Sequence, residues 1–307
     1  MKQVFFIIGI FLSFSVFAQQ APLFTQYYVN DMVINPAISG SKTYNPLVIQ
    51  TRQQWLGFEG APLTSTISYH GALNNRSAMG GSLMFDKAFP SMQASLHLNY
   101  AYHIPLDYDR VNLSFGLGAK FMYHNLDFNE GDLPVAYDQA FSTSSYDKTL
   151  ADATSGVYLY GRDFYAGFSI SNMFQSSFND PIYGSPYGNL EYKNYYGMAA
   201  YRLNIINNDW HIEPSFFIRK MQYQRSITDL STRIFYLENT WAGLTYRTNG
   251  TAIFSFGLGV ENMYVSYSYD HTFSGEIMQY TYGTHELGVT FRIQKMATQR
   301  HIGFWGY

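Results

Sequence analysis

Apolar and polar residues alternate with a period of two along most of the chain after residue 46. Between Ser91 and Ile104, most even positions are apolar and most odd positions are polar. Between Val111 and Tyr123, apolar residues occupy the odd positions, and Asn, Ser, Gly and Lys occupy all the even ones except Met122. Successive side chains of a β-strand point to opposite faces. The pattern therefore predicts strands that each have one apolar and one polar face.

About 14 segments show this alternation, an even number as in bacterial single-chain transmembrane barrels. We place the strands at residues 46–54, 63–73, 78–86, 93–104, 110–124, 154–162, 163–173, 193–205, 210–219, 226–236, 240–247, 251–259, 262–271 and 284–293.

The connections between these segments alternate in length. Counted from a periplasmic start, the short links 74–76, 161–163, 207–209 and 260–261 all fall on the periplasmic side. The longer links 125–153, 174–192 and 272–283 fall on the outer side, where 248–250 is the one short link. Outer-membrane barrels have short periplasmic turns and longer external loops.

A soluble β-sandwich also alternates, but its apolar faces pack against each other and its outer faces carry charge. Here the polar face carries mainly Ser, Thr, Asn and Gly. Aromatic residues make up 19% of the chain and charged residues only 13%, roughly half the usual charged share. The mean hydropathy is −0.17, and no apolar run beyond residue 18 is long enough for a membrane helix. The sequence favours an all-β, transmembrane antiparallel barrel.

The N-terminus has the features of a secretory signal peptide. Lys2 precedes an apolar stretch from Val4 to Phe17, and Ala18 supplies a small residue for cleavage before Gln19. A short membrane anchor is the alternative, but the stretch is too short to span a bilayer. We therefore divide the chain into a signal peptide (1–18), an N-terminal periplasmic or lumen segment (19–45), an outer-membrane barrel (46–293) and a C-terminal periplasmic tail (294–307).

Motifs for catalysis or cofactor binding do not emerge from the sequence. It holds no cysteine, no phosphate-binding loop and no nucleophile elbow, and a net charge of −3 gives no reason to expect nucleic acid. Four histidines, His70, His97, His103 and His124, stand singly within strand patterns. We predict no catalytic, cofactor-binding or metal-binding residue, no cofactor and no enzyme.

Charged residues on the polar faces are the remaining candidates for function. They either pair inside the barrel and stiffen it, or line a path for a solute or peptide. By alternation they are Lys120, Arg202, Arg247, Asp270, Glu286 and Arg292.

Several ordered blocks flank the first strand. The first block is Phe24-Thr25-Gln26-Tyr27-Tyr28-Val29-Asn30, and it is followed by Ile34-Asn35-Pro36-Ala37 and Gly40-Ser41. A longer block from Arg52 to Pro62 reads RQQWLGFEGAP. Shorter blocks occur at Thr64, Thr66–His70, Ser268–Asp270 and Gly283–Leu287. These blocks resemble the PorP/SprF family of the Bacteroidetes type IX secretion system. Tyr28 and Val29 depart mildly from the Met and Phe that the family often has there.

The resemblance implies a barrel that supports secretion or cell-surface attachment of adhesin-like cargo, and with it gliding motility. The implied partners are outer-membrane lipid, periplasmic lipoprotein or motor-linked components, and the secreted cargo protein. A general or substrate-selective porin is the alternative.

Two of the matching blocks invite a physical interpretation. Because Asn35-Pro36 disfavours helix, residues 24–34 should form a short helical or turned piece that ends there. This piece enters the lumen, seals its periplasmic mouth or is a flexible leader. The loop 55–62 is either part of an interfacial aromatic girdle or a docking surface. The partner or plug candidates are Phe24, Gln26, Tyr27, Asn30, Asn35, Pro36, Trp55 and Phe58.

Overall fold

Strands make up most of the structure, a computed structural model that describes residues 24–106, 110–127, 145–176, 191–206, 209–237, 239–273 and 280–295. The predicted signal peptide and all but two residues of the predicted tail lie outside these ranges. Two short 3-10 helices, η1 (Asp31–Val33) and η2 (Pro36–Ile38), precede the strands. The strands are β1 (Asn45–Gln53), β2 (Leu63–Ala72), β3 (Ser77–Ala88), β4 (Ser91–Leu106), β5 (Val111–Asp127), β6 (Ser145–Gly161), β7 (Phe164–Ser171), β8 (Asn194–Tyr201), β9 (Leu203–Ile206), β10 (Trp210–Met221), β11 (Ile227–Tyr236), β12 (Thr240–Arg247), β13 (Thr251–Val260), β14 (Met263–Thr272) and β15 (Thr284–Ile293).

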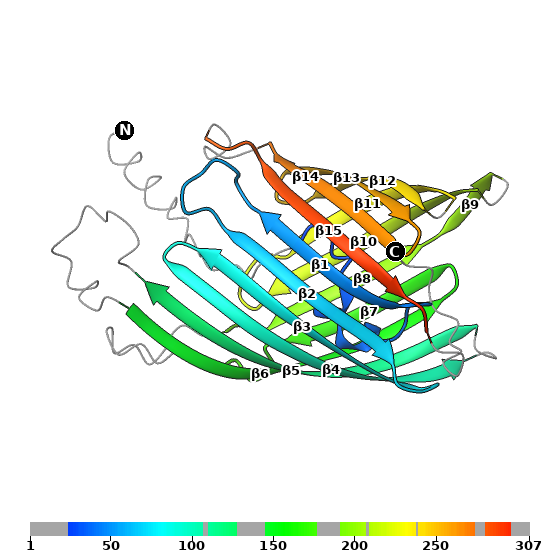
Figure 1. The fold of residues 1–307 in the computed structure, drawn as a ribbon, viewed down its shortest axis with the longest axis horizontal. Helices are drawn as coiled ribbons and strands as arrows, with labels where there is room; N and C mark the ends of the chain where they lie inside the picture. Colours follow the sequence, from blue (N-terminus) through cyan, green and yellow to red (C-terminus); the bar gives the residue numbers. More distant parts are fainter. Residues whose placement is uncertain are drawn as a thin grey trace, which may run out of the picture.

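The strands close into one antiparallel ring (Figure 1). Each pairs with the next along the chain, and β1 pairs with β15 over nine residues from Asn45 with Ile293 to Gln53 with His285. Because β8 and β9 both pair with β10 on either side of Arg202, they form one interrupted strand. The ring therefore has 14 strands, which confirms the predicted barrel.

Burial on the strands is inverted relative to a soluble protein. In β2, Thr64, Thr66, Ser68 and His70 are buried, whereas Leu63, Ile67 and Tyr69 are at least 40% exposed. The same holds in β13, where Ser255 is buried and Phe254 and Phe256 are exposed. An apolar outer face and a polar inner face are what a wall between acyl chains and a polar interior requires.

The two ends of the barrel differ. One, which we call the short-turn end, carries the beginning of β1, the end of β15 and the links after β2, β4, β6, β9, β11 and β13. None of these links exceeds four residues. The opposite, long-loop end carries the links 54–62, 128–144, 172–193, 222–226 and 273–283, together with the short links 89–90 and 248–250. The separation into two ends matches the predicted alternation of connections, except that 89–90 is a second short link at the long-loop end beside 248–250.

The strand predicted at 154–162 begins nine residues earlier, at Ser145. In this extension Leu150 and Asp152 are buried, whereas Thr149 and Ala151 face outward. Apolar and polar residues thus do not sort between the faces, and the alternation that marks the other strands is missing. The ladder with β5 still continues to Asp127 opposite Ser145, because backbone pairing needs no side-chain pattern.

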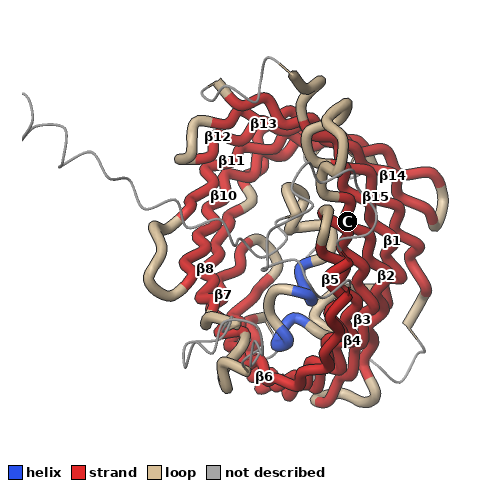
Figure 2. The backbone as a smooth tube through the Cα atoms, turned by 90° about the vertical axis from the view of Figure 1, so that its left-hand side faces the viewer, coloured by secondary structure: helices blue, strands red, loops and turns tan. Residues whose placement is uncertain are grey.

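Residues 24–44, which we call the luminal segment, lie inside the ring of strands. Figure 2 shows η1 and η2 surrounded by the wall. Asn35 caps η2 by accepting a hydrogen bond from Ala37 N at 3.0 Å, and Pro36 follows at the first helical position. Among the described residues, no helix has the length and apolarity needed to cross a membrane.

Candidate functional site in the barrel interior

The luminal segment is almost completely buried. Val33 and Ile34 are half-buried, and Thr43 is its one exposed residue. The polar side chains of Gln26 and Asn35 lie fully inside the protein. A buried polar group is costly unless it is hydrogen-bonded, so the partners of these polar residues define the site.

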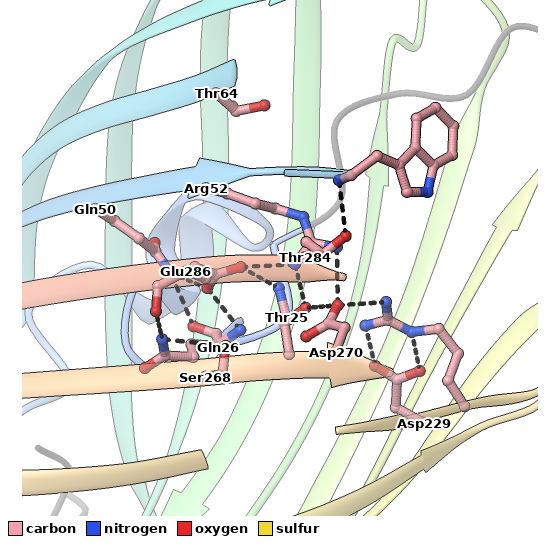
Figure 3. Close-up of polar contacts among 12 residues, drawn as sticks. Thr25, Gln26, Gln50, Arg52, Thr64, Asp229, Ser268, Asp270, Thr284 and Glu286 are labelled. Carbon is pink, nitrogen blue, oxygen red and sulfur yellow. Dashed lines mark hydrogen bonds and ion pairs between the residues drawn. The ribbon is translucent and has the colours of Figure 1, made fainter. Parts of the chain in front are cut away.

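Glu286, on β15, binds the beginning of the luminal segment. Its two carboxylate oxygens accept hydrogen bonds from the backbone N–H groups of Thr25 at 2.7 Å and Gln26 at 2.8 Å. They also accept from Gln50 Nε2 at 2.7 Å and Arg52 at 3.1 Å, both on β1 (Figure 3). One carboxylate thus joins the segment to the first and last strands of the barrel.

Buried charges of alternating sign continue around the wall from this point. Arg52 donates to Asp270 at 2.9 Å, and the Thr25 hydroxyl donates to the same oxygen at 2.7 Å. Arg247 lies 3.7 Å from Asp270 and binds Asp229 through two parallel hydrogen bonds of 2.8 Å (Figure 3). We call these charged residues, with Glu286, the charge network. It spans the wall from β11 to β1 and holds the beginning of the luminal segment.

A second charged group packs against the aromatic side chains of the segment. Glu213 accepts hydrogen bonds from Arg202 at 3.0 Å and from Arg233. The Arg233 guanidinium lies 3.7 Å from the centre of the Tyr28 ring, within the range of a cation–π interaction. Tyr27 stacks on Phe217 at 4.2 Å between ring centres. The interior here is packed by rings and salt bridges together.

Glycines on the wall leave room for the backbone of the segment. A Cβ on Gly116 would lie 2.1 Å from Ala37 N, and one on Gly156 would lie 2.1 Å from Asn35 Oδ1. Asn35 also donates to the backbone carbonyl of Val157 at 3.0 Å. These two glycines therefore form a recess for η2.

The end of the segment is held at the short-turn end. His103 Nε2 donates to Ser39 O at 2.9 Å, and its Nδ1 accepts from the Tyr160 hydroxyl at 3.0 Å. Gly40 N donates to His70 Nδ1 at 2.9 Å, and Lys295 donates to Gly40 O at 3.0 Å. These histidines bind backbone and hydroxyl groups, and the described residues contain no group of three or more His, Asp or Glu suited to a metal ion.

The luminal segment also contains its own ion pair. Lys42 Nζ lies 2.5 Å from Asp31 Oδ2, and both residues are buried. Burial raises the pKa of the Asp31 carboxyl above its ordinary value, and Lys42 opposes that rise. The pair links η1 to the chain that leads into β1.

Replacing Lys42 by methionine should lower the free energy of unfolding by about 3 kcal/mol, because it leaves a buried carboxylate without its cation. The double variant Asp31→Leu with Lys42→Met removes both charges and should recover most of that loss. The deficit of the single variant should shrink as the pH falls, because protonation of Asp31 removes the unpaired charge. Urea unfolding in lipid vesicles measures both variants against the wild type; equal losses in the single and double variants would contradict the expectation.

Most of the candidates expected from the sequence lie inside the barrel. Six of them are buried in the luminal segment: Phe24, Gln26, Tyr27, Asn30, Asn35 and Pro36. Four more are buried on the wall: Asp270, Glu286, Arg247 and Arg202. Lys120 is buried apart from them and donates to Asn172 at 3.2 Å. Arg292 is half-buried near the short-turn end, over the rings of Tyr44 and Tyr264. It does not approach Glu286, although both lie on the inner face of β15.

Sequence reasoning misses several charged wall residues. Arg52 stands in the sequence only as part of the block that ends at Pro62, yet it joins Glu286 and Asp270. Asp229 and Arg233 stand four residues apart on the inner face of β11, and Glu213 lies opposite Arg233 in the register of β10 and β11. Their positions on the polar faces of strands indicate that they point into the interior. Which of them pair with one another can be told only from the register between the strands.

Trp55 and Phe58 lie at the long-loop end. Trp55 is half-buried, and its backbone N–H donates to Thr284 Oγ1 at 3.2 Å. Backbone hydrogen bonds of 2.8 Å join Leu56 to both Tyr282 and Gly283. Leu56 and Phe58 remain 41% and 48% exposed. The loop 55–62 is thus held against the loop before β15 while presenting apolar side chains.

Comparison with known protein families identifies the family of this chain. The family described as "Type IX secretion system membrane protein PorP/SprF" matches residues 16–291. The chain belongs to this family. The PorP/SprF match and the closed barrel identify an outer-membrane component of the type IX secretion system. No curated protein sequence matches the chain significantly.

Solved structures share the fold at low sequence identity. The toluene transporter TbuX of Ralstonia pickettii is 8% identical, and the match covers 87% of this chain and 94% of that one with a TM-score of 0.52. The outer membrane protein Omp33 of Acinetobacter baumannii is 10% identical over 83% of this chain and 100% of that one, with a TM-score of 0.46. The likeness to TbuX supports the barrel fold.

Proposed function

We propose that this PorP/SprF protein supports secretion or cell-surface attachment of cargo such as adhesins, as a barrel whose lumen is occupied by its own N-terminal segment. In this proposal the long-loop end faces outward and the short-turn end faces periplasmic lipoprotein or motor-linked components. Its role is binding, not catalysis. Family membership supports the secretion context.

The observation that carries the proposal is the attachment of the luminal segment to the wall. Buried hydrogen bonds hold it at Glu286, at Ser114 and at His103, along much of the barrel's height. A water-filled porin keeps a polar channel open. Here, by contrast, the rings of Tyr27 and Tyr28 pack against Phe217 and Trp241. This packing supports a role as a scaffold rather than as an open channel.

The apolar loop 55–62 is the candidate contact for cargo. Its backbone bonds to Tyr282 and Gly283 hold it in place, and its exposed Leu56 and Phe58 offer apolar surface. Exposed apolar surface that gathers in one patch is typical of interaction sites. Cargo would bind there without entering the lumen.

Deletion of the gene, followed by complementation, tests the function. The deletion should retain cargo in the periplasm, and the wild-type gene should restore it to the surface or medium. A variant with Leu56→Ser and Phe58→Ser should assemble normally but restore less cargo. Leu73→Ser, a matched exposed leucine at the short-turn end, should restore wild-type levels. Unchanged cargo export in the deletion strain would refute the proposed function.

Conductance separates the scaffold from the porin. The purified full-length protein should be nearly silent in planar bilayers, because the luminal segment occupies the interior. Steady open-channel conductance from the intact protein would favour the substrate-selective or general porin instead. A porin of known conductance, reconstituted in the same lipid, serves as the positive control.

A further inference from the structure

The first half of β6 is paired on one side only. Its ladder with β5 runs over the whole strand, from Ser145 to Gly161. On the other side, β7 pairs only with Ser155–Tyr160. Within the ranges that the structure describes, residues 145–154 of β6 therefore have no strand on their second side.

The chain that follows β7 covers only the end of this second side. Met173 N donates to Ala153 O at 3.0 Å, and the hydroxyl of Ser176 donates to Ala151 O at 2.5 Å. In an antiparallel strand, the N–H and C=O groups of one residue point to one side, and those of the next residue point to the other. The odd-numbered residues in this part of β6 therefore direct their backbone groups away from β5.

Asp147 and Thr149 are the preceding odd-numbered residues. Their N–H and C=O groups point to the same side as those of Ala151, and no residue in the described part of the chain forms a hydrogen bond with them there. We call these four groups the β6 edge. Such a row of backbone donors and acceptors is what an edge strand offers to another extended chain.

The β6 edge lies beyond the apolar belt of the barrel. Asp147, Thr149 and Ala151 face outward and are exposed, whereas the outward residues on the belt are apolar, as Phe168 is on β7. A charged side chain and backbone groups without partners are unfavourable among acyl chains. Figure 1 shows β5 and β6 reaching further toward the long-loop end than the other strands. The edge thus belongs to a part of the wall that projects from the bilayer.

We propose that the β6 edge binds an extended segment of the cargo, which adds to the barrel wall as a strand antiparallel to β6. The segment continues the line of β7, which pairs with the same side of β6 in that direction. Antiparallel pairing is also the more stable arrangement. The inference rests on the proposed function only where it names the partner as cargo, because the backbone groups select an extended polypeptide whatever its origin.

Side chains beside the edge define the chemistry of the segment. Asp147 is exposed on the outward face, so a lysine or arginine opposite it forms a cross-strand ion pair, and a serine or threonine suits the place opposite Thr149. At the other end of the edge, Phe174 is 74% exposed, and its N–H binds the carboxylate of Asp152 at 2.9 Å. The expected segment therefore has a basic residue, a hydroxyl residue two positions away and an apolar residue beyond it.

A second copy of the chain does not fit this edge. Copies in one membrane share one orientation, and barrel strands tilt roughly 35–45° from the membrane normal. A two-fold axis along the normal therefore crosses the two β6 strands at roughly 70–90°, whereas neighbouring strands of a sheet differ by only about 20–25°. The partner is thus a different polypeptide, whose segment can align with β6.

A proline at position 149 tests the edge. Thr149→Pro removes the N–H group that the segment would use, and the ladder with β5 is kept because that N–H faces away from β5. Thr149→Ala is the matched control, because it removes the side chain and keeps the backbone donor. Tagged full-length proteins are checked for the heat-dependent gel shift of a folded barrel and purified from outer membranes in mild detergent. Mass spectrometry then quantifies the secreted proteins that co-purify.

We expect Thr149→Pro to lower the co-purified amount of one secreted protein about tenfold, the effect of losing one or two hydrogen bonds. Thr149→Ala should stay within about twofold of the wild type. Benzoylphenylalanine in place of Phe174 should cross-link, under light, to a segment of that same protein with the expected side-chain pattern. If Thr149→Pro lacks the gel shift, Asp147→Pro replaces it, because its N–H faces the same side.

Equal amounts of co-purified protein from the wild type, the proline variant and the alanine variant would overturn the inference. Equal losses in the two variants would do the same, and so would cross-links from position 174 only to another copy of this chain or to lipid. A different result separates the two proposals. If the proline variant loses a protein whose export is unchanged when the gene is deleted, the β6 edge stands and the proposed function fails.

Discussion

Replacing Glu286 by alanine should lower the free energy of unfolding by about 3–5 kcal/mol, the range for removing one partner of a buried ion pair. The change removes the acceptor for Thr25 N, Gln26 N and Gln50 and one of the two carboxylates around Arg52. Urea unfolding in lipid vesicles gives the free energy, and tryptophan fluorescence follows the transition.

Glu59→Ala is the control, because Glu59 lies on an exposed loop. It should change the free energy of unfolding by less than about 0.5 kcal/mol. Glu286→Gln keeps the shape and part of the hydrogen bonding but not the charge. Its loss in free energy of unfolding should lie between those of Glu286→Ala and Glu59→Ala. A loss for Glu286→Ala as small as that for Glu59→Ala would show that the contacts to the luminal segment contribute little.

Gly116→Ala should lower the free energy of unfolding by about 3 kcal/mol, which is at the upper end of the usual effect of overpacking. The added Cβ would lie 2.1 Å from Ala37 N and 2.4 Å from the carbonyl carbon of Pro36, so η2 must move from its recess. Because the obstructing atoms belong to the backbone, a side-chain rotation cannot relieve the clash. The same urea unfolding experiment measures the loss.

Gly81→Ala is the matched control in a neighbouring part of the wall. Its Cβ would meet nothing closer than 3.4 Å, the distance to His97 O. It should cost no more than about 0.5 kcal/mol. Both variants change glycine to alanine within a strand, so the difference between them isolates the contact with the luminal segment. Equal losses would mean that η2 does not depend on the recess.

The fold is largely predictable because its signal is local. Two-residue alternation marks a strand whatever it pairs with, so segments 240–247 and 284–293 coincide with β12 and β15. The extension of β6 from Ser145 escapes prediction because Leu150 faces inward and Thr149 outward, which reverses the rule. The break at Arg202 between β8 and β9 has no sequence signal of its own.

The interior is predictable only in part. Alternation places Asp270, Glu286 and Arg247 on inner faces, but their partners depend on the register between strands distant in sequence. Arg52 meets Glu286 across 234 residues, and its role is invisible until β1 is set beside β15. The role of Gly116 is hidden in a similar way, because a glycine in a strand shows that something approaches closely without showing what.

Thr25 and Gln26 touch the first strand through Arg52 and Gln50 and the last two through Asp270 and Glu286. The joint that turns a sheet into a cylinder is therefore made partly of residues that precede the sheet. In a sheet that has not closed, Arg52 and Glu286 would lie too far apart to form their ion pair, and the luminal segment could not contact both. Circular closure and the filling of the centre should consequently occur in one cooperative step, with no stable hollow cylinder along the way.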